Sequence, residues 1–477
     1  MHSKSFSCLP GVPVRLGVGI MSFAICFITY IMRSNFAISQ LAMVQKNNND
    51  TDNGPRYEWT SNEVSWVQGA FFFGNCISTF PAGFITEFYG GSLTTTISLI
   101  ISVILTATTP ITCQLSVWAL YANRVILGIS NGVFFPALHN VVSKWAPPDE
   151  KGKFVAALLG GNVGTVFTFQ LTPYITELYG WESTFYGEAV LVLITTVLWM
   201  LLVSNTPHTH RFISEKEVNY IETSLGSTVS KEKQIPPYRK IFSSISFISL
   251  ILLHFGNLWG LFFLLTIAPE YMQSSLNFNM KESGIYSSLP HLARFLAGFL
   301  FGQIGDYLRH RNTNSTFLRK FFCIFSHILP GLLLLAVPYI KNTGLIISLL
   351  TLSLGFNGSA TLTNLQNSQD LAPNFAGTLY SIINGIGFSS GFFGPLLKNL
   401  FVHYGPIYNF NPWSAMFMVG GFGYIVPAVL FWFLGTAEVQ EWNEIKKSRN
   451  INTEESQQQS EYSQDRDTNN ENHQTKL

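Results

Sequence analysis

The stretch from Leu16 to Val44 is predominantly apolar, and its single charged side chain is Arg33. A helix needs roughly 20 apolar residues to cross the hydrocarbon core of a membrane, and this stretch exceeds that length. At about 1.5 Å of rise per residue, Arg33 lies roughly 25 Å from the start of such a helix and about 15 Å from its end. An arginine at that depth costs at least about 2.5 kcal/mol unless it faces a polar cavity or a partner. The stretch therefore predicts a membrane-spanning helix that carries a functional arginine.

Apolar stretches of this kind recur along the whole chain. Charged residues make up 12% of the 477 residues, whereas soluble proteins carry about 25%. Eleven further spanning helices are predicted at about residues 65–85, 93–112, 117–141, 154–175, 183–203, 245–271, 283–304, 321–340, 344–364, 377–401 and 413–434. The sequence therefore predicts an all-α polytopic membrane protein of twelve transmembrane helices, arranged as two six-helix repeats. A formal net charge of +1 without a basic cluster argues against a nucleic-acid partner.

The predicted domains follow from where the apolar stretches stop. We expect an N-terminal segment at 1–15, a six-helix bundle at 16–205, a central loop at 206–240, a second six-helix bundle at 241–436 and a disordered polar tail at 437–477. The N-terminal segment lacks a small-residue cleavage site, which predicts that the first helix is kept as a signal anchor. Lys and Arg gather on the side that holds both termini and the central loop, so this side is predicted to be cytoplasmic.

Three features of the loops and ends concern modification and location. Asn49 begins a sequon in a loop predicted to lie outside the cell, where it can be glycosylated. The chain ends in Thr475-Lys476-Leu477, which can add as a strand to a PDZ groove, with a chance match as the alternative. No acidic dileucine signal stands near either end, which favours the plasma membrane over lysosomes or vesicles.

A short motif recurs at matching places in the two halves. Gly83 precedes Glu87 by four residues, and Gly302 precedes Asp306 by four, with Arg309 just beyond. Residues four apart share a helix face, so we expect the glycine to admit a neighbouring helix and the acid to pair with a cation or a helix N-terminus. The recurrence favours two parallel repeats, the arrangement of a rocking transporter, over a loop-edge acid beside an ordinary glycine.

Two arginines are predicted at matching depth. Arg124 lies roughly 10 to 15 Å below the outer surface, and Arg33 lies about 15 Å below the same surface. Neither helix carries a carboxylate, so we expect an anion between them, which a planar guanidinium can bind in a bidentate way. The alternative is a structural arginine satisfied by backbone carbonyls. Arg294 is a third arginine inside a predicted helix, with a weaker case for substrate contact.

Further polar side chains fall inside the predicted helices. We assign three asparagines to the substrate site, although asparagine joins helices as often as it binds ligands: Asn35, Asn131 and Asn257. Glu188 and Glu270 can each pair with an arginine or a cation. Three histidines can titrate in a proton relay, although each alone is more often a packed residue: His254, His291 and His327.

Sequence motifs of enzymes are missing. No HExxH, GxSxG or P-loop occurs, so ATP hydrolysis is excluded and a secondary transporter without a cofactor is predicted, not an enzyme. The five cysteines form no CxxC pair and are interpreted as small packed hydrophobes, with no metal site. A membrane-embedded acyl- or glycosyltransferase using His254 or His291 would need an acidic or metal-bound partner, which the sequence does not offer. A non-transporting sensor is a further alternative.

Several stretches carry a family resemblance, among them YIMRSNFAISQLAMV, GAFFFGNCISTFPAGFITEFYGG, NRVILGISNGVFFPALHNVVSKWAPPDE and LPHLARFLAGFLFGQIGDYLR. With LLTIAPEYM and DLAPNFAGTLYSIINGIG, they resemble the anion/cation symporter family of the major facilitator superfamily, which includes sialin, the vesicular glutamate transporters and the type I sodium/phosphate cotransporters. The resemblance covers nearly the whole membrane part. It implies a twelve-helix fold, alternating access and an anionic substrate, with Arg33 and Arg124 on family arginines linked with anion binding.

The departures from the family pattern bear on substrate and coupling. Proton-coupled members carry a glutamate where this chain has Asn131, and vesicular glutamate transporters carry a histidine at Gln68 and an arginine at Asn257. The resemblance therefore favours a sodium-coupled carrier of inorganic phosphate or a small organic anion. The alternative is a sialin-like, proton-coupled exporter of acidic sugars or other organic anions.

Overall fold

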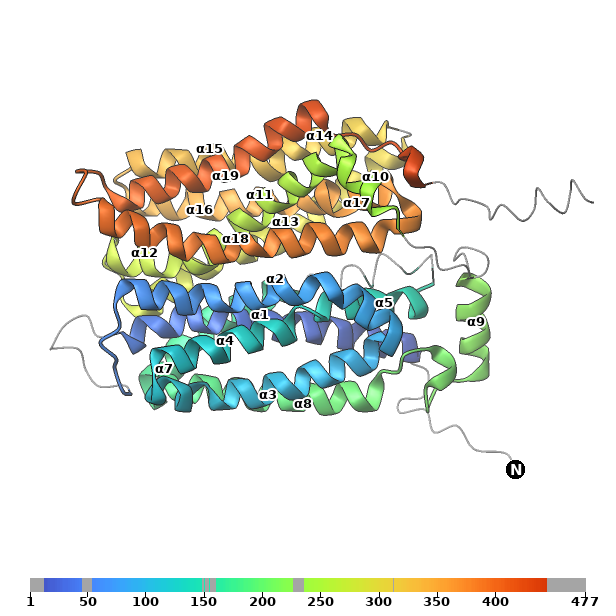
Figure 1. Cartoon of the computed structure of the whole chain (residues 1–477), viewed down its shortest axis with the longest axis horizontal. Coiled ribbons are helices and arrows are strands. Elements are labelled where there is room, and N and C mark those ends of the chain that lie inside the picture. Colours follow the sequence, from blue (N-terminus) through green and yellow to red (C-terminus); the bar gives the residue numbers. More distant parts are fainter. Residues whose placement is uncertain are drawn as a thin grey trace, which may run out of the picture.

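A computed structural model describes residues 13–44, 54–147, 150, 154, 160–225, 236–311 and 313–443. The sequon at Asn49 and the C-terminal Thr475-Lys476-Leu477 lie outside the described residues. Figure 1 shows two layers of long helices, the N-terminal half in blue to green and the C-terminal half in yellow to red.

The N-terminal half contains six membrane-spanning segments. Its helices are α1 (Val14–Met43), α2 (Ser61–Tyr89), α3 (Gly91–Leu115), α4 (Val117–Asn131), α5 (Phe134–Trp145), α7 (Gly160–Tyr179) and α8 (Trp181–Leu202). A turn at Gly132 and Val133 divides the fourth span into α4 and α5. Three short elements connect this half to the next: η2 (Pro207–Thr209), α9 (Glu215–Leu225) and α10 (Tyr238–Ser243).

The C-terminal half contains the other six segments, several of them broken. The elements are α11 (Ile245–Thr266), α12 (Ala268–Ser274), α13 (Met280–His310), α14 (Ser315–Cys323), η4 (Ile324–Ile328), α15 (Leu329–Ala336), η5 (Val337–Tyr339), α16 (Thr343–Asn357), η6 (Gly358–Leu362), α17 (Asn364–Leu371), η7 (Pro373–Phe375), α18 (Ala376–Tyr404), α19 (Pro412–Leu434) and η8 (Glu441–Asn443). The predicted all-α fold of twelve spans in two halves is confirmed, with ends that differ from prediction by a few residues.

Hydropathy sets four spans apart from the other eight. Within the described residues, eight spans are long and apolar enough to cross a membrane by length and composition alone. The other four, α2, α7, α13 and α18, pack in pairs across the halves, α2 on α18 and α7 on α13. One such contact is polar, because the Gln170 amide nitrogen donates to the Ser288 hydroxyl at 2.7 Å. The same four helices also expose large apolar side chains, such as Phe84 and Leu296, so each has a polar face toward protein and an apolar face.

Glycines set the closest contact inside the N-terminal half. A Cβ at Gly128 of α4 would lie 2.1 Å from the carbonyl oxygen of Phe71, and a Cβ at Gly74 of α2 would lie 2.1 Å from that of Val125. Two helix backbones can approach this closely only where neither carries a side chain. The contact holds Phe71 of α2 against α4.

Two segments assigned by sequence to the loop and the tail pack onto the bundles. Arg15 in the first turn of α1 binds Glu150 at 2.9 Å and Glu217 of α9 at 3.1 Å. In the predicted tail, the Gln440 backbone N–H donates to the carbonyl of Leu371 at 2.9 Å, and the adjacent η8 buries an indole ring. Residues 437–443 therefore belong to the C-terminal half, because their apolar and backbone groups find partners there.

Candidate functional site

Arg33 is buried within a set of aromatic rings that come from both halves. Its side chain is 2% exposed, and its guanidinium carbon lies over the rings of Tyr30, Phe71, Phe262 and Phe388 at 4.4, 5.7, 5.3 and 4.9 Å from their centroids. Among the described residues, none of its three guanidinium nitrogens has a well-aligned hydrogen-bond partner, although the Tyr30 side chain lies close enough to interact with it electrostatically and as a hydrogen-bond acceptor of poor geometry. Aromatic faces stabilise a cation but leave its hydrogen-bond donors unused.

Arg124 lies beside Arg33. Its guanidinium carbon is 5.0 Å from the centroid of Phe36 and 5.0 Å from that of Phe71, the ring that Arg33 also contacts. Its Nη1 donates to the carbonyl of Met32 at 3.3 Å, and its Nε has no partner within the described chain. The structure thus brings the two arginines together, as their matching depth predicts.

Ion pairing distinguishes these two arginines from the other buried cations. Two further basic side chains are buried in the described residues, and each pairs with a carboxylate: Arg319 with Asp370 at 2.6 Å and Lys398 with Glu270 at 2.8 Å. Arg33 and Arg124 form no ion pair with a carboxylate in that part of the chain. Buried charges are ordinarily paired, so this pair of cations is suited to an external anion.

Asn35 and Glu188 form a polar cluster beside Arg124. The amide nitrogen of Asn35 donates to Glu188 Oε2 at 2.6 Å, and its amide oxygen accepts from Ser39 at 2.9 Å and from Thr172 at 3.1 Å. Glu188 also interacts electrostatically with Arg124. Glu188 is a single carboxylate within the apolar part of its helix, which is weak evidence by itself, and its neighbours become visible only when α8 is placed against α1 and α4.

Arg294 and His254 lie on the C-terminal side. Arg294 of α13 is half-buried and interacts electrostatically with Tyr30, the ring that also contacts Arg33, and with His254. The Asn364 amide donates to His254 Nδ1 at 2.7 Å, and His254 Nε2 meets the amide oxygen of Asn384 at 3.3 Å. This hydrogen-bond pattern fits a neutral imidazole, with Nε2 as the donor.

The remaining asparagines and Gln68 are engaged in helix contacts. Asn131 donates to the Leu127 carbonyl at 2.9 Å within α4, and Asn257 of α11 accepts from Asn357 of α16 at 2.9 Å. Gln68 of α2 donates to the Thr266 carbonyl of α11 at 2.9 Å. The structure does not join Asn131 or Asn257 to Arg33 by any hydrogen bond among the described residues.

The repeated glycine motif has different surroundings in its two copies. A Cβ at Gly83 would lie 3.5 Å from the Ser381 hydroxyl of α18, an ordinary contact between helices. A Cβ at Gly302 would meet nothing within 4 Å, whereas one at Gly305 would lie 2.5 Å from Leu362. In α13 the close approach therefore falls at Gly305, because that glycine, and not Gly302, faces η6.

The charged residues of the motif lie at the surface. Glu87 and Asp306 are exposed. Arg309 is also exposed, and its Nη2 donates to the amide oxygen of Gln366 on α17 at 2.7 Å. Arg309 therefore joins two segments of the same half.

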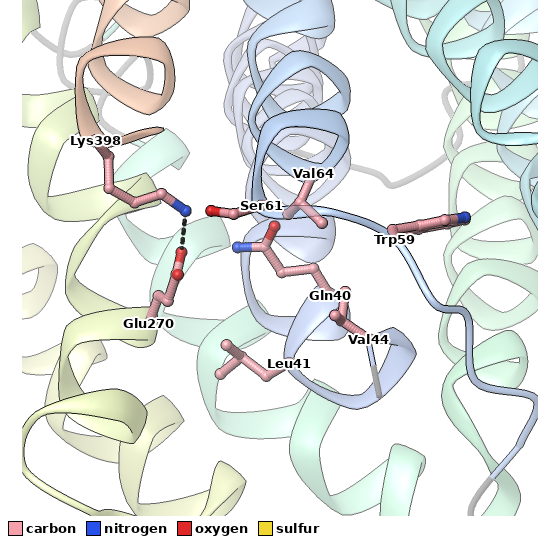
Figure 2. Close-up of a pocket in the computed structure, with 8 residues that line it drawn as sticks. All are labelled: Gln40, Leu41, Val44, Trp59, Ser61, Val64, Glu270 and Lys398. Atoms are coloured by element: carbon pink, nitrogen blue, oxygen red, sulfur yellow. Dashed lines mark hydrogen bonds and ion pairs between the residues drawn. The ribbon is translucent and has the colours of Figure 1, made fainter. Parts of the chain in front are cut away.

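A pocket of about 150 Å³ lies between the halves, at the end of the bundle where α1 ends and α2 begins. Its lining residues are Gln40, Leu41, Val44, Trp59, Ser61, Val64, Glu270 and Lys398. Figure 2 shows the Lys398–Glu270 ion pair on one side and the Gln40 amide pointing toward it from α1. Gln40 lies near the end of α1, so the pocket is lined in part by the helix that carries Arg33.

Comparison with known proteins identifies the family. The model of the Major Facilitator Superfamily matches residues 20–395. Sialin from Homo sapiens is 30% identical over 467 residues, covering 91% of this chain and 94% of that protein, and vesicular glutamate transporter 3 from Danio rerio is 29% identical, covering 91% and 75%. The partially occluded inward-open conformation of the xylose transporter XylE from E. coli shares the fold, with a TM-score of 0.63 and 13% identity over 88% of this chain and 96% of that one. The chain is a transporter of the major facilitator superfamily and belongs to the anion/cation symporter family that its sequence resembles.

Proposed function

We propose that this protein carries a small anion, inorganic phosphate or an organic anion, by alternating access, with Arg33 and Arg124 as its ligands. The observation that carries the proposal is the Arg33 guanidinium, which is buried, surrounded by four aromatic side chains and without a well-aligned acceptor among the described residues. A carboxylate or phosphate group placed against it would accept the bonds that this part of the chain does not supply. Asn35 lies two residues after Arg33 on the same helix, where it donates to Glu188.

Sodium is the first candidate for the coupling ion, because Asn131 replaces the glutamate of proton-coupled relatives. A second candidate, a proton-coupled exporter of acidic sugars or other organic anions, is supported by a specific observation. Glu188 provides a buried carboxylate beside Arg124, although on a different helix from Asn131. The 30% identity to sialin supports the same candidate.

Counterflow in proteoliposomes tests the proposal directly. Vesicles preloaded with phosphate, glutamate, sialate or urate are assayed for uptake of the same labelled anion, with and without sodium. We expect at least one anion to exchange in the wild type and to fail in Arg33→Ala and Arg124→Ala at limiting concentration. Normal exchange in both variants would refute the assignment of the site.

We further propose a plasma-membrane location with both termini in the cytoplasm, a glycan on Asn49 and a PDZ partner at Thr475-Lys476-Leu477. The support is the distribution of Lys and Arg and the two short motifs. A glycosidase-sensitive change in mobility that Asn49→Gln abolishes would establish both the modification and the side on which this loop lies. If Asn49→Gln kept the glycosidase-sensitive change in mobility, the proposed glycan on Asn49 would be wrong.

A further inference from the structure

Glu188 is the one buried carboxylate of the described residues, with 6% of its surface exposed. It lies on α8, away from the rings that surround Arg33, and the anion site as described does not use it. An ionised carboxylate in an apolar interior is costly unless it has a counter charge, and binding a proton is the other way to remove that cost.

Asn35 can hold Glu188 in place in both charge states. The amide oxygen of Asn35 already accepts from the hydroxyls of Ser39 and Thr172, so the amide nitrogen is the atom turned toward Glu188. This nitrogen donates to Oε2 at 2.6 Å. A protonated carboxyl group still offers an accepting oxygen, so the bond persists when Oε1 carries a proton. Protonation therefore requires no rearrangement of the cluster.

The charged and titratable groups around Glu188 come from α4 and α3. Arg124 of α4 attracts the carboxylate electrostatically, and the buried thiol of Cys113 on α3 interacts in turn with Arg124. The other helices packed against α8 contribute uncharged groups to the cluster: Asn35 of α1 donates to the carboxylate, and Thr172 of α7 donates to Asn35. Arg124 is thus the group whose charge Glu188 offsets.

We propose that Glu188 binds a coupling proton, an inference that rests on the anion site at Arg33 and Arg124 and on the second, proton-coupled candidate for its transport in place of sodium. Ionised Glu188 and a bound anion repel each other and compete for the positive charge of Arg124. A proton on Glu188 removes this competitor, so the proton strengthens anion binding, and by linkage the anion strengthens proton binding to the same degree. Mutual strengthening of two ligands at neighbouring sites of one half is the thermodynamic basis of symport.

The pH dependence of anion affinity tests this role. Sialate, glutamate and inorganic phosphate are each titrated in wild type and in Glu188→Gln, whose amide oxygen can still accept from Asn35. We expect wild-type affinity to rise by up to about tenfold for each unit of pH decrease while one linked group titrates. Glu188→Gln should bind tightly at every pH and exchange the anion in counterflow, but a pH gradient should no longer drive its accumulation.

Two further variants serve as controls. Glu182→Gln removes a carboxylate from the first turn of the same helix, where it accepts from Gln114, and should keep the wild-type slope. Glu188→Asp keeps a titratable group and should keep a slope, which separates loss of the proton site from general damage to the fold.

The contrary outcomes are distinct. Equal pH slopes in wild type and Glu188→Gln would overturn the proton assignment. Affinity that depends on sodium at constant pH, and loses this dependence in Glu188→Gln, would overturn it in favour of sodium among the oxygens of Glu188, Asn35 and Thr172. A wild type that neither binds nor exchanges any of the anions would instead overturn the proposed function itself.

Discussion

Arg33 and Arg124, on different helices of the N-terminal half, lie over the same phenylalanine ring. Phe71 is 5.7 Å from the guanidinium carbon of the first and 5.0 Å from that of the second. The two carbons can therefore be no further apart than the sum of these distances. One anion of moderate size can therefore contact both guanidinium groups. Two arginines with separate structural roles would not need to lie this close together.

The charge and the shape of Arg33 are expected to contribute separately to transport. Arg33→Lys keeps the charge but loses the planar fork, and hydrogen bonds to charged groups are worth about 1.5–3 kcal/mol, so uptake at limiting anion should fall roughly 10- to 100-fold. Arg33→Ala should lose more. Initial rates of counterflow measure both. The exposed Arg311 provides the control, and Arg311→Ala should exchange at the wild-type rate.

Thermal unfolding in detergent should separate a binding arginine from a structural one. Arg319→Met breaks the buried pair with Asp370 and should cost about 3–5 kcal/mol, because the carboxylate is left uncompensated. Arg33→Met removes a cation that has no well-aligned acceptor among the described residues, so the unfolding temperature should stay unchanged or rise. A similar loss of stability in both variants would indicate that Arg33 is a structural residue.

A methyl group at Gly128 should disturb the contact between α2 and α4. The added Cβ would lie 2.1 Å from the Phe71 carbonyl, and overpacking of this kind costs about 1–3 kcal/mol. Gly128→Ala should therefore unfold at a lower temperature and bind anion more weakly, since the Phe71 ring contacts both arginines. Gly187→Ala is the matched control in a helix, because nothing lies within 4 Å of its new methyl group. Equal unfolding temperatures in the two variants would contradict the close contact.

Charge reversal at Lys281 should favour opening at the end of the bundle that holds the pocket. Lys281 of α13 forms an ion pair with Glu177 of α7 across the halves, and exposed pairs contribute about 0.2–1 kcal/mol. Lys281→Glu should thus shift the conformational equilibrium by at least about 1.4- to 5-fold, measured as the distance distribution between spin labels at Leu178 and Ser274.

The double variant Glu177→Lys with Lys281→Glu should restore the original distribution, because the pair re-forms with reversed charges. Lys341→Glu, on an exposed loop of the C-terminal half, is the control for a change of net charge and should leave the distribution unaltered. Failure of the double variant to recover would mean that the pair does not hold this end closed.

The loop after α8 should lose stability in acid through His210. Burial lowers the pKa of His210 below its usual range, and the neutral ring meets the Leu202 carbonyl through Nε2 at 3.2 Å and accepts the Phe212 N–H at Nδ1 at 3.2 Å. A depressed pKa in the folded state stabilises the fold above the unfolded value of about 6.5, and this contribution is lost as pH falls below it. The unfolding temperature should therefore drop between about pH 7 and pH 5 more steeply in wild type than in His210→Gln. Parallel curves would contradict this.

The sequence predicts the spans and the depths of the arginines because both follow from local hydropathy and helix rise. It does not predict which faces of different helices meet. Glu188 is a single carboxylate within the apolar part of its helix, and its relation to Arg124 depends on how α8, α1 and α4 pack. The four rings around Arg33 are equally hidden, since the chain holds 41 Phe and no pattern distinguishes Phe262 or Phe388 from residues that face lipid.

The glycine motif shows the same limit at finer scale. Gly302 and Gly305 lie less than one turn apart, and a small rotation of the helix decides which of them meets η6. The sequence shows that glycines occur in this turn of α13, but it does not show how the helix is rotated about its axis. The packing of the short polar segments is likewise not visible in the sequence, because Glu217 and Gln440 gain their partners only from the assembled bundles.

The rings around Arg33 are shared between the halves, whereas those around Arg124 belong to one half alone. Rocking the halves apart would separate Arg33 from Phe262 and Phe388 and leave Arg124 with Phe36 and Phe71. A carrier without its anion would then have to strip water from the charged Arg33 guanidinium each time it passes through the closed arrangement. In a loaded carrier the bound anion neutralises that charge. Reorientation should consequently be slow whenever the anion is absent, also when the coupling ion alone is bound, and this is what keeps a carrier from leaking its driving ion.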